Sequence, residues 1–210
     1  MKSRTLASAI RAFSLLSMLV GTAAVAEDFR PGFLSGVIND YSPSNVKGGP
    51  WEMHGQWSMD LRREWRSGDT ADFYADMTMS GFVTTALSGP NETTVPVQTS
   101  GGVNPHTHHI RLTNMKVTWD MTGCPAFLPP ATLDGFQING IVSLITGNGS
   151  LAPFETTPIT TNLQVCVTGG SEVPYSNVTL VFTGPATSHF GSQAIHGVVR
   201  KVSLSDFGRR

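Results

Sequence analysis

Residues 51–61 read WEMHGQWSMDL, and apolar and polar side chains alternate along this stretch. The odd positions carry the apolar side chains of Trp51, Met53, Trp57, Met59 and Leu61. An alternation of period two is typical of a β-strand with one buried face. After the turn residues 67–69, a second alternating run covers 72–79. The two runs therefore predict a β-hairpin.

Further short strands are predicted along the rest of the chain, and turn signals separate them. They cover residues 108–112, 115–119, 136–144, 159–168, 176–183 and 193–204. Residues 87–104 show no sustained alternation and predict a long surface loop, while 124–130 form a proline-rich crossing. About eight strands predict a single all-β domain, either an antiparallel β-barrel or a β-sandwich. Periodicity alone does not choose between the two.

Composition and charge exclude several other classes of protein. Only 14% of the 210 residues are charged, while 40% are hydrophobic, which excludes a disordered chain and a coiled coil. The 22 glycines and 13 prolines make long helices improbable. Lysine and arginine number 14 against 15 aspartates and glutamates, without a basic run outside the first residues. A nucleic-acid partner is therefore not expected. The sequence leaves the oligomeric state open.

The first 26 residues have the pattern of a secretory signal peptide. Positive charges come first, an apolar stretch covers 13–20, and Ala24 and Ala26 precede Glu27. No second apolar run is long enough to cross a bilayer as a helix. We therefore expect a secreted or periplasmic protein without a transmembrane segment after cleavage. Residues 27–49 are predicted as an N-terminal arm and 50–210 as the β domain.

The chain has two cysteines, Cys124 and Cys166, and both follow the predicted signal peptide. An oxidising compartment favours their pairing. A disulfide between them would close a loop of about 42 residues and contribute roughly 3 to 4 kcal/mol to stability. The alternative is a pair of separate thiols, and the pattern favours the disulfide.

Histidines gather in two places that suggest a metal site. His106 and His108 are two apart at the start of a predicted strand, so their side chains project from the same face about 6.5 to 7 Å apart. Ile110 and Leu112 share that face, which indicates that it points inward. Near the last strand, His189 or His196 can supply a third imidazole. His196 shares its strand face with the apolar residues Ala194, Val198 and Val202, which predicts that this face also points inward. The alternative is a hydrogen-bonded group of histidines that binds nothing.

Neutral imidazole is a ligand for zinc, copper, iron or nickel, so these four histidines predict a site for a divalent transition metal without naming the metal. Three protein ligands would leave a coordination position for water or a small substrate. The first functional hypothesis is therefore an exported β protein with a histidine-rich metal pocket and oxidative or hydrolytic chemistry. No catalytic residue can be named, and the sequence has no nucleophile elbow, no HExxH motif and no phosphate-binding glycine loop.

Gly55-Gln56-Trp57 in the first long strand and Arg200 in the last one resemble the calycin arrangement of lipocalins. In that arrangement a Gly-x-Trp on the first strand packs beneath an arginine from the final strand. The resemblance implies a closed barrel with a cavity for a small ligand. The alternative is that Trp57 is an ordinary core residue and Arg200 an exposed one.

Two other functions remain as alternatives. A metal-free barrel would bind or isomerise a small apolar molecule in a cavity lined by large apolar side chains. The candidates for that lining are Trp51, Trp57, Met59, Met77, Met79 and Phe82. The third hypothesis is a structural surface protein without a site.

Overall fold

The structure, a computed structural model, describes most of the predicted β domain. The described residues are 31–43, 45–47, 50–63, 68–81, 83–86, 94–97, 103–121, 123–125, 135–144, 159–169 and 175–204. The predicted signal peptide, residues 1–26, lies outside them. Within the described part of the chain, no helix has the length and apolar character needed to cross a membrane.

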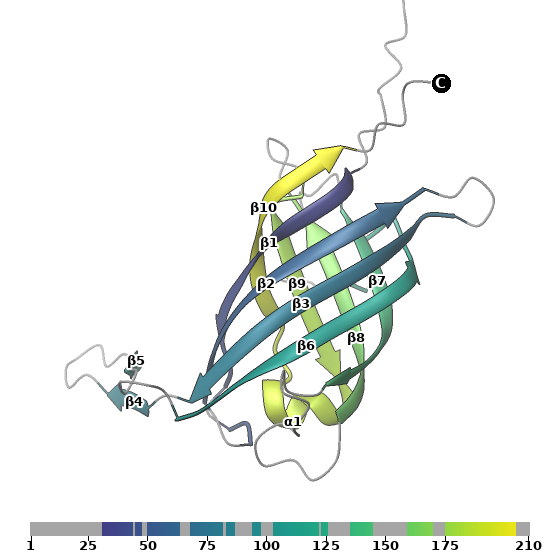
Figure 1. Cartoon of the computed structure of the whole chain (residues 1–210). Coiled ribbons are helices and arrows are strands. Elements are labelled where there is room, and N and C mark those ends of the chain that lie inside the picture. The colour runs from purple at the N-terminus through teal and green to yellow at the C-terminus, as the bar shows by residue number, and fades with distance from the viewer. Residues whose placement is uncertain are drawn as a thin grey trace, which may run out of the picture.

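Eight antiparallel strands form a nearly closed barrel (Figure 1). The strands are β1 (Pro31–Tyr41), β2 (Trp51–Arg62), β3 (Thr70–Gly81), β6 (Val103–Lys116), β7 (Phe136–Leu144), β8 (Ile159–Thr168), β9 (Asn177–Thr183) and β10 (Ile195–Leu204). Their order in the sheet is β6-β3-β2-β1-β10-β9-β8-β7. The β2–β3 hairpin predicted from the alternation is confirmed. The sequence predicted either a barrel or a sandwich, and the structure is a barrel.

The seam of the barrel lies between β6 and β7, which the sheet order leaves at its two ends. Beyond the end of β6, Thr118 forms an isolated antiparallel bridge with Gln137, and each backbone N–H donates to the other's carbonyl at 2.9 Å. A side chain at Gly140 in β7 would lie only 2.5 Å from Met115 Sδ and 2.6 Å from Leu112 Cδ2. Side chains of β6 therefore pack against β7 along the seam, where no ladder of backbone hydrogen bonds joins these two strands.

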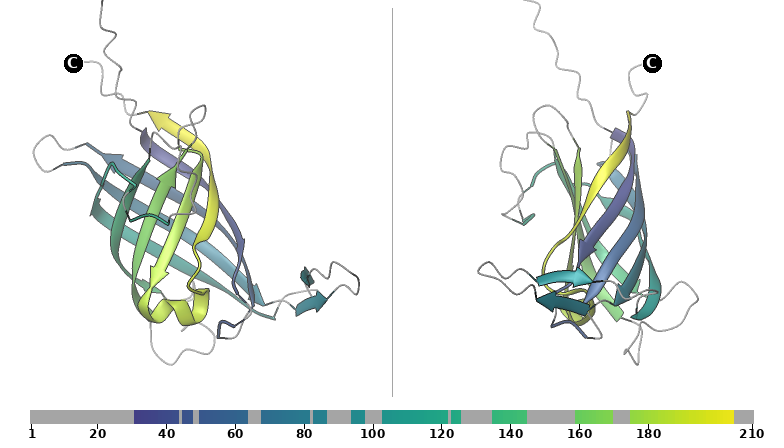
Figure 2. Two further views of the ribbon diagram at one scale, coloured as in Figure 1. Left: turned by 180° about the vertical axis from the view of Figure 1, so that it is seen from behind. Right: turned by 90° about the vertical axis from the view of Figure 1, so that its left-hand side faces the viewer.

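The short segment between β9 and β10 covers one end of the barrel (Figure 2). It consists of the 3-10 turn η1 (Gly184–Ala186) and the helix α1 (Thr187–Phe190). Two further strands, β4 (Val83–Ala86) and β5 (Thr94–Val97), pair as a small ribbon that extends away from the barrel. Both β5 and the start of β6 fall inside the stretch 87–104, so the prediction of one long loop there was wrong.

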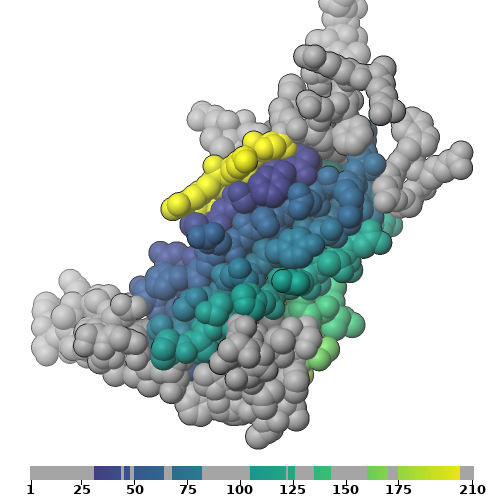
Figure 3. All heavy atoms as spheres, viewed as in Figure 1, coloured from purple at the N-terminus to yellow at the C-terminus, as the bar shows by residue number. Residues whose placement is uncertain are grey.

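The barrel interior is filled by the apolar faces of the strands. In β2 and β3 the odd-numbered side chains point inward, and Trp51, Met53, Met59 and Phe73 are fully buried. Ile110 and Leu112 of β6 are buried as well, which confirms the inward face predicted for this strand. Figure 3 shows the closely packed outer surface of the wall formed by β10, β1, β2, β3 and β6.

The disulfide between Cys124 and Cys166 is present and joins the segment after β6 to β8, with 6.2 Å between the two Cα atoms. Gln164, also on β8, donates from Nε2 to the Gly123 carbonyl at 3.1 Å. The side chain of Gln137 donates to the Asp120 carbonyl at 3.2 Å. These contacts hold the segment after β6 against the strands β7 and β8.

Two elements differ from the sequence prediction. Residues Pro31–Tyr41 were assigned to the N-terminal arm, but they form β1 and pair with both β2 and β10. Apolar residues occur on both faces of β1, with Leu34 buried inside and Val37 on the opposite face, so its alternation is hidden. The predicted strand 108–112 lies within β6. Of the predicted strand 115–119, only residues 115 and 116 belong to β6, and Thr118 forms the isolated bridge with Gln137. Asn114 has a φ of 57°, a local left-handed conformation that asparagine tolerates, and the break in the pattern occurs there.

Candidate metal centre

Strand β6 places His106 and His108 on its inward face. Both lie opposite buried residues of β3, because the register pairs Met79 with His106 and Met77 with His108. His108 is completely buried, whereas His106 is partly exposed at the edge of the interior. The predicted two-residue spacing therefore brings both imidazoles to the same side of the sheet.

Helix α1 supplies the third histidine, His189, which is also completely buried. The chain turns into η1 at Gly184, where φ is 72°, and leaves α1 at Gly191, where φ is 93°. Phe190 anchors the helix, because its ring stacks on Phe182 of β9 with 4.6 Å between centroids. The backbone N–H of Lys47 donates to the Ser188 carbonyl at 2.7 Å and fixes the helix from outside the sheet.

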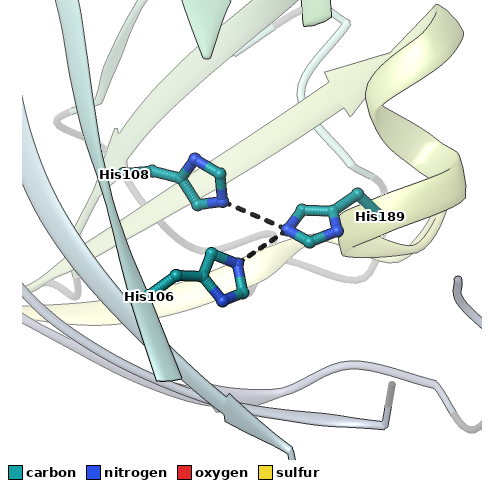
Figure 4. Close-up of side chains that lie close together, drawn as sticks. All are labelled: His106, His108 and His189. Carbon is teal, nitrogen blue, oxygen red and sulfur yellow. Dashed lines mark hydrogen bonds between the residues drawn. The ribbon is translucent and has the colours of Figure 1, made fainter. Parts of the chain in front are cut away.

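The three imidazoles converge through their Nε2 atoms (Figure 4). His189 Nε2 lies 3.0 Å from His106 Nε2 and 3.1 Å from His108 Nε2. All three ligand atoms lie within 4.8 Å of one another, and the group contains no carboxylate or thiolate. The sequence predicted this convergence for His106 and His108 and left the third member open between His189 and His196.

Hydrogen bonds among the three rings cannot satisfy all three of the converging nitrogen atoms at once. Each imidazole nitrogen carries either one N–H or one lone pair, so His189 Nε2 can form one well-directed bond with only one of its two neighbours at a time. A metal ion accepts one lone pair from each ring and satisfies all three nitrogens together. Three neutral imidazoles around one ion are also an established ligand set for zinc.

Aromatic rings hold the histidines in place. Trp51 lies edge-on to His106, with 5.0 Å between ring centroids, and 5.5 Å from His189. Phe190 lies 5.2 Å from His108 and 4.9 Å from His189. Nδ1 of His189 is buried and has no hydrogen-bond partner among the described residues, so its ring is oriented chiefly by packing.

The buried position keeps His189 neutral. Desolvation by burial, together with the charges of His106 and Lys47, lowers the pKa of His189 to about 3. At neutral pH the ring is therefore an uncharged imidazole, which is the form that binds a metal ion. Protonation of His189 would have to occur in an apolar interior, so it competes with metal binding only in acid.

The remaining described histidines lie elsewhere, each beside a carboxylate. His196 is exposed on β10, and its Nδ1 lies 3.0 Å from Asp40 Oδ2. His54 lies 2.8 Å from Glu52, and His109 contacts Asp76. The prediction that His196 shares an inward apolar face was wrong, because Val198 and Val202 on that face are 47% and 41% exposed. Valines on both faces of β10 make the inward side impossible to read from alternation.

The residues predicted to line an apolar ligand pocket are mostly core residues. Trp51, Met59, Met77 and Met79 are fully buried, Trp57 is nearly so, and Phe82 lies outside the described residues. Trp57 stacks on Phe73, with 6.2 Å between ring centroids. Arg200 is exposed on β10 and lines a surface groove with Trp57. A metal-free ligand pocket at these residues stays a prediction.

Gly191 is expected to be essential for the position of α1. A Cβ at this residue would lie 2.5 Å from Pro43 Cδ, and the φ of 93° disfavours any L side chain. We expect Gly191→Ala to destabilise the protein by roughly 2 kcal/mol or more in urea unfolding, within the range for a strained backbone. Gly68→Ala is the matched control, because Gly68 also has a positive φ but nothing lies within 4 Å of its Cβ position. Equal losses from both variants would show that contact with Pro43 does not matter.

The chain matches no protein-family model, no curated protein and no solved structure, so the case for a function depends on its own residues.

Proposed function

We propose that this protein binds one transition-metal ion through His106, His108 and His189. The observation that carries the proposal is the approach of three Nε2 atoms from two separate elements, β6 and α1, to one point. Tetrahedral coordination at the usual metal–nitrogen distance of about 2.0 to 2.1 Å separates the ligand nitrogens by roughly 3.3 Å. The two distances to His189 Nε2, 3.0 and 3.1 Å, differ from that value by only a few tenths of an ångström, and the ligand atoms of His106 and His108 lie within 4.8 Å of each other. Small side-chain movements therefore admit the ion.

The number of ligands in the proposed site allows chemistry as well as binding. Three protein ligands leave at least one coordination position for water or a small substrate, which is the arrangement of catalytic rather than structural zinc sites. His106 is the partly exposed member, so an exchangeable ligand would arrive on its side. Oxidative or hydrolytic turnover of a small extracellular substrate remains our proposal for this position.

We also propose that the protein functions outside the cytoplasm. The support is the disulfide between Cys124 and Cys166, because disulfides persist in oxidising compartments and are rare in the cytosol. In the extracellular space or the periplasm, the histidine site would take its metal from that environment.

Elemental analysis tests metal binding directly. The protein, purified without chelator or affinity tag, should contain close to one equivalent of a transition metal, or take it up from zinc or copper salts. The variant His106→Ala/His108→Ala should lose this metal while its circular dichroism spectrum is unchanged. His54→Ala/His109→Ala is the matched control, since it removes two exposed histidines and should retain the metal. An absence of binding by the unmodified protein after incubation with both metals would refute the proposal.

A further inference from the structure

A buried methionine lies opposite each β6 histidine of the proposed site. The β3–β6 register places Met79 directly across from His106 and Met77 directly across from His108. Both methionines are 0% exposed and belong to the inward face of β3. Directly opposed residues of an antiparallel pair have Cβ atoms about 4.5 to 5.5 Å apart on the same face. Two thioethers therefore border the histidine cluster.

Thioethers at this position are well suited to complete a metal site. Methionine is unbranched and has three rotatable side-chain bonds, so its sulfur can move toward an ion without a change in the backbone. On the other side of β3, Met53 of β2 pairs with Met79 and is also fully buried. The wall beside the imidazoles is thus rich in sulfur.

The charge of the ligand set limits which ion it favours. The three histidines form a group without carboxylate or thiolate, and His108 and His189 are completely buried. The free energy needed to transfer an ion into an apolar medium grows with the square of its charge. Desolvation of a monovalent ion therefore costs about one quarter as much free energy as desolvation of a divalent ion of the same size. Neutral ligands in an apolar wall therefore favour a soft monovalent cation.

We propose that the centre is a copper site in which the thioether of Met77 or Met79 acts as a weak, displaceable fourth ligand beside the three imidazoles and stabilises Cu(I). Imidazole binds copper in proteins, and thioether sulfur selects Cu(I) over harder ions. This inference rests on the proposed metal site and assigns its metal. It also assigns a ligand role to one of two residues that the sequence indicated only as the lining of an apolar pocket.

X-ray absorption at the copper edge tests the sulfur ligands in the unmodified protein. The full chain is loaded with one equivalent of Cu(I) under ascorbate, and the first coordination shell is measured. We expect nitrogen together with at least one sulfur. The cysteines cannot supply that sulfur as thiolates, because both are in the disulfide. A shell of nitrogen and oxygen alone overturns the inference.

Affinity measurements on methionine variants provide an independent test. Met77→Leu/Met79→Leu retains the size and the apolar character of both side chains, which cores usually tolerate. We expect its Cu(I) affinity, measured by competition with a chromogenic chelator, to fall roughly 10- to 100-fold, the range seen when partners of a metal site are removed. Its Zn²⁺ affinity should change less than about threefold, because the imidazoles remain.

Met59→Leu is the matched control for this experiment. Met59 is equally buried on the inward face of β2, but it lies opposite Phe73 and away from the histidines. It should leave the Cu(I) affinity unchanged. An equal loss of Cu(I) and Zn²⁺ affinity in the double variant, or an equal loss in Met59→Leu, overturns the thioether role. If the unmodified protein binds neither ion, the proposed metal function fails together with this inference.

Discussion

Replacement of His189 by alanine is expected to lower the affinity for zinc or copper by at least about 100-fold, beyond the range typical of changes in residues that only support a ligand. His189 is the only described contribution of α1 to the cluster, and its Nε2 lies between those of His106 and His108. Without it, two imidazoles from a single strand remain. Isothermal titration of the metal-free protein with Zn²⁺ measures the loss.

The matched control for this prediction is His196→Ala. His196 is the other histidine that the sequence offered as third ligand, and it lies exposed beside Asp40 on the outer surface. Its replacement should leave metal affinity and stoichiometry unchanged. A comparable loss from His196→Ala would mean that the metal binds elsewhere on the barrel. Retention of full affinity by a folded His189→Ala variant would contradict the three-histidine site itself.

The strands of this fold could be predicted where one face is apolar and the other polar. The alternation in 51–61 and 72–79 predicted β2 and β3, and 136–144 and 159–168 match β7 and β8 residue for residue. The prediction failed for β1, whose Val37 is on the outer face while Leu34 is inside. Such a strand has no periodicity that separates inside from outside. Only its pairing with β2 and β10 reveals it as part of the barrel.

Closure of the barrel also could not be predicted from the sequence. It requires β6 and β7 to meet at the seam, and it requires β1 to pair with β10, where Leu34 and Val202 are 168 positions apart in the chain. Local patterns carry no information about contacts at this separation, because the number of strands, their tilt and their shear decide them together. A barrel and a sandwich have the same alternation.

The candidate site shows the same division between local and long-range information. The spacing of His106 and His108 predicted two imidazoles on one face, since strand geometry is local. The choice between His189 and His196 depended on two facts that the pattern does not contain. The first is that β10 exposes its His196 face, and the second is that a short helix before β10 covers the barrel end and carries His189 inward. Four residues are too few for a helical periodicity to be seen.

Acidification is expected to destabilise the metal-free protein through His189. Burial lowers the pKa of this group to about 3 in the folded state, while the unfolded chain has the ordinary value near 6.5. Above pH 6.5 both states are neutral and the histidine has no effect on stability. Below that value the unfolded state binds a proton that the folded state does not, so the free energy of unfolding falls until the pH reaches the folded pKa. For this single group the loss between pH 7 and pH 4 is roughly 3 kcal/mol.

Comparison with His189→Gln isolates this contribution from that of the carboxylates. Glutamine does not titrate, so the variant should lose roughly 3 kcal/mol less than the unmodified protein between pH 7 and pH 4. The measurement is urea unfolding of both proteins in chelator across this range, with His196→Gln as the control for an exposed histidine. Addition of metal should steepen the dependence for the unmodified protein and for His196→Gln but not for His189→Gln, because protons then compete directly with the ion for the three imidazoles. Parallel stability curves for the unmodified protein and His189→Gln would show that His189 is not buried as a neutral ring, and an enclosed imidazole site would then be untenable.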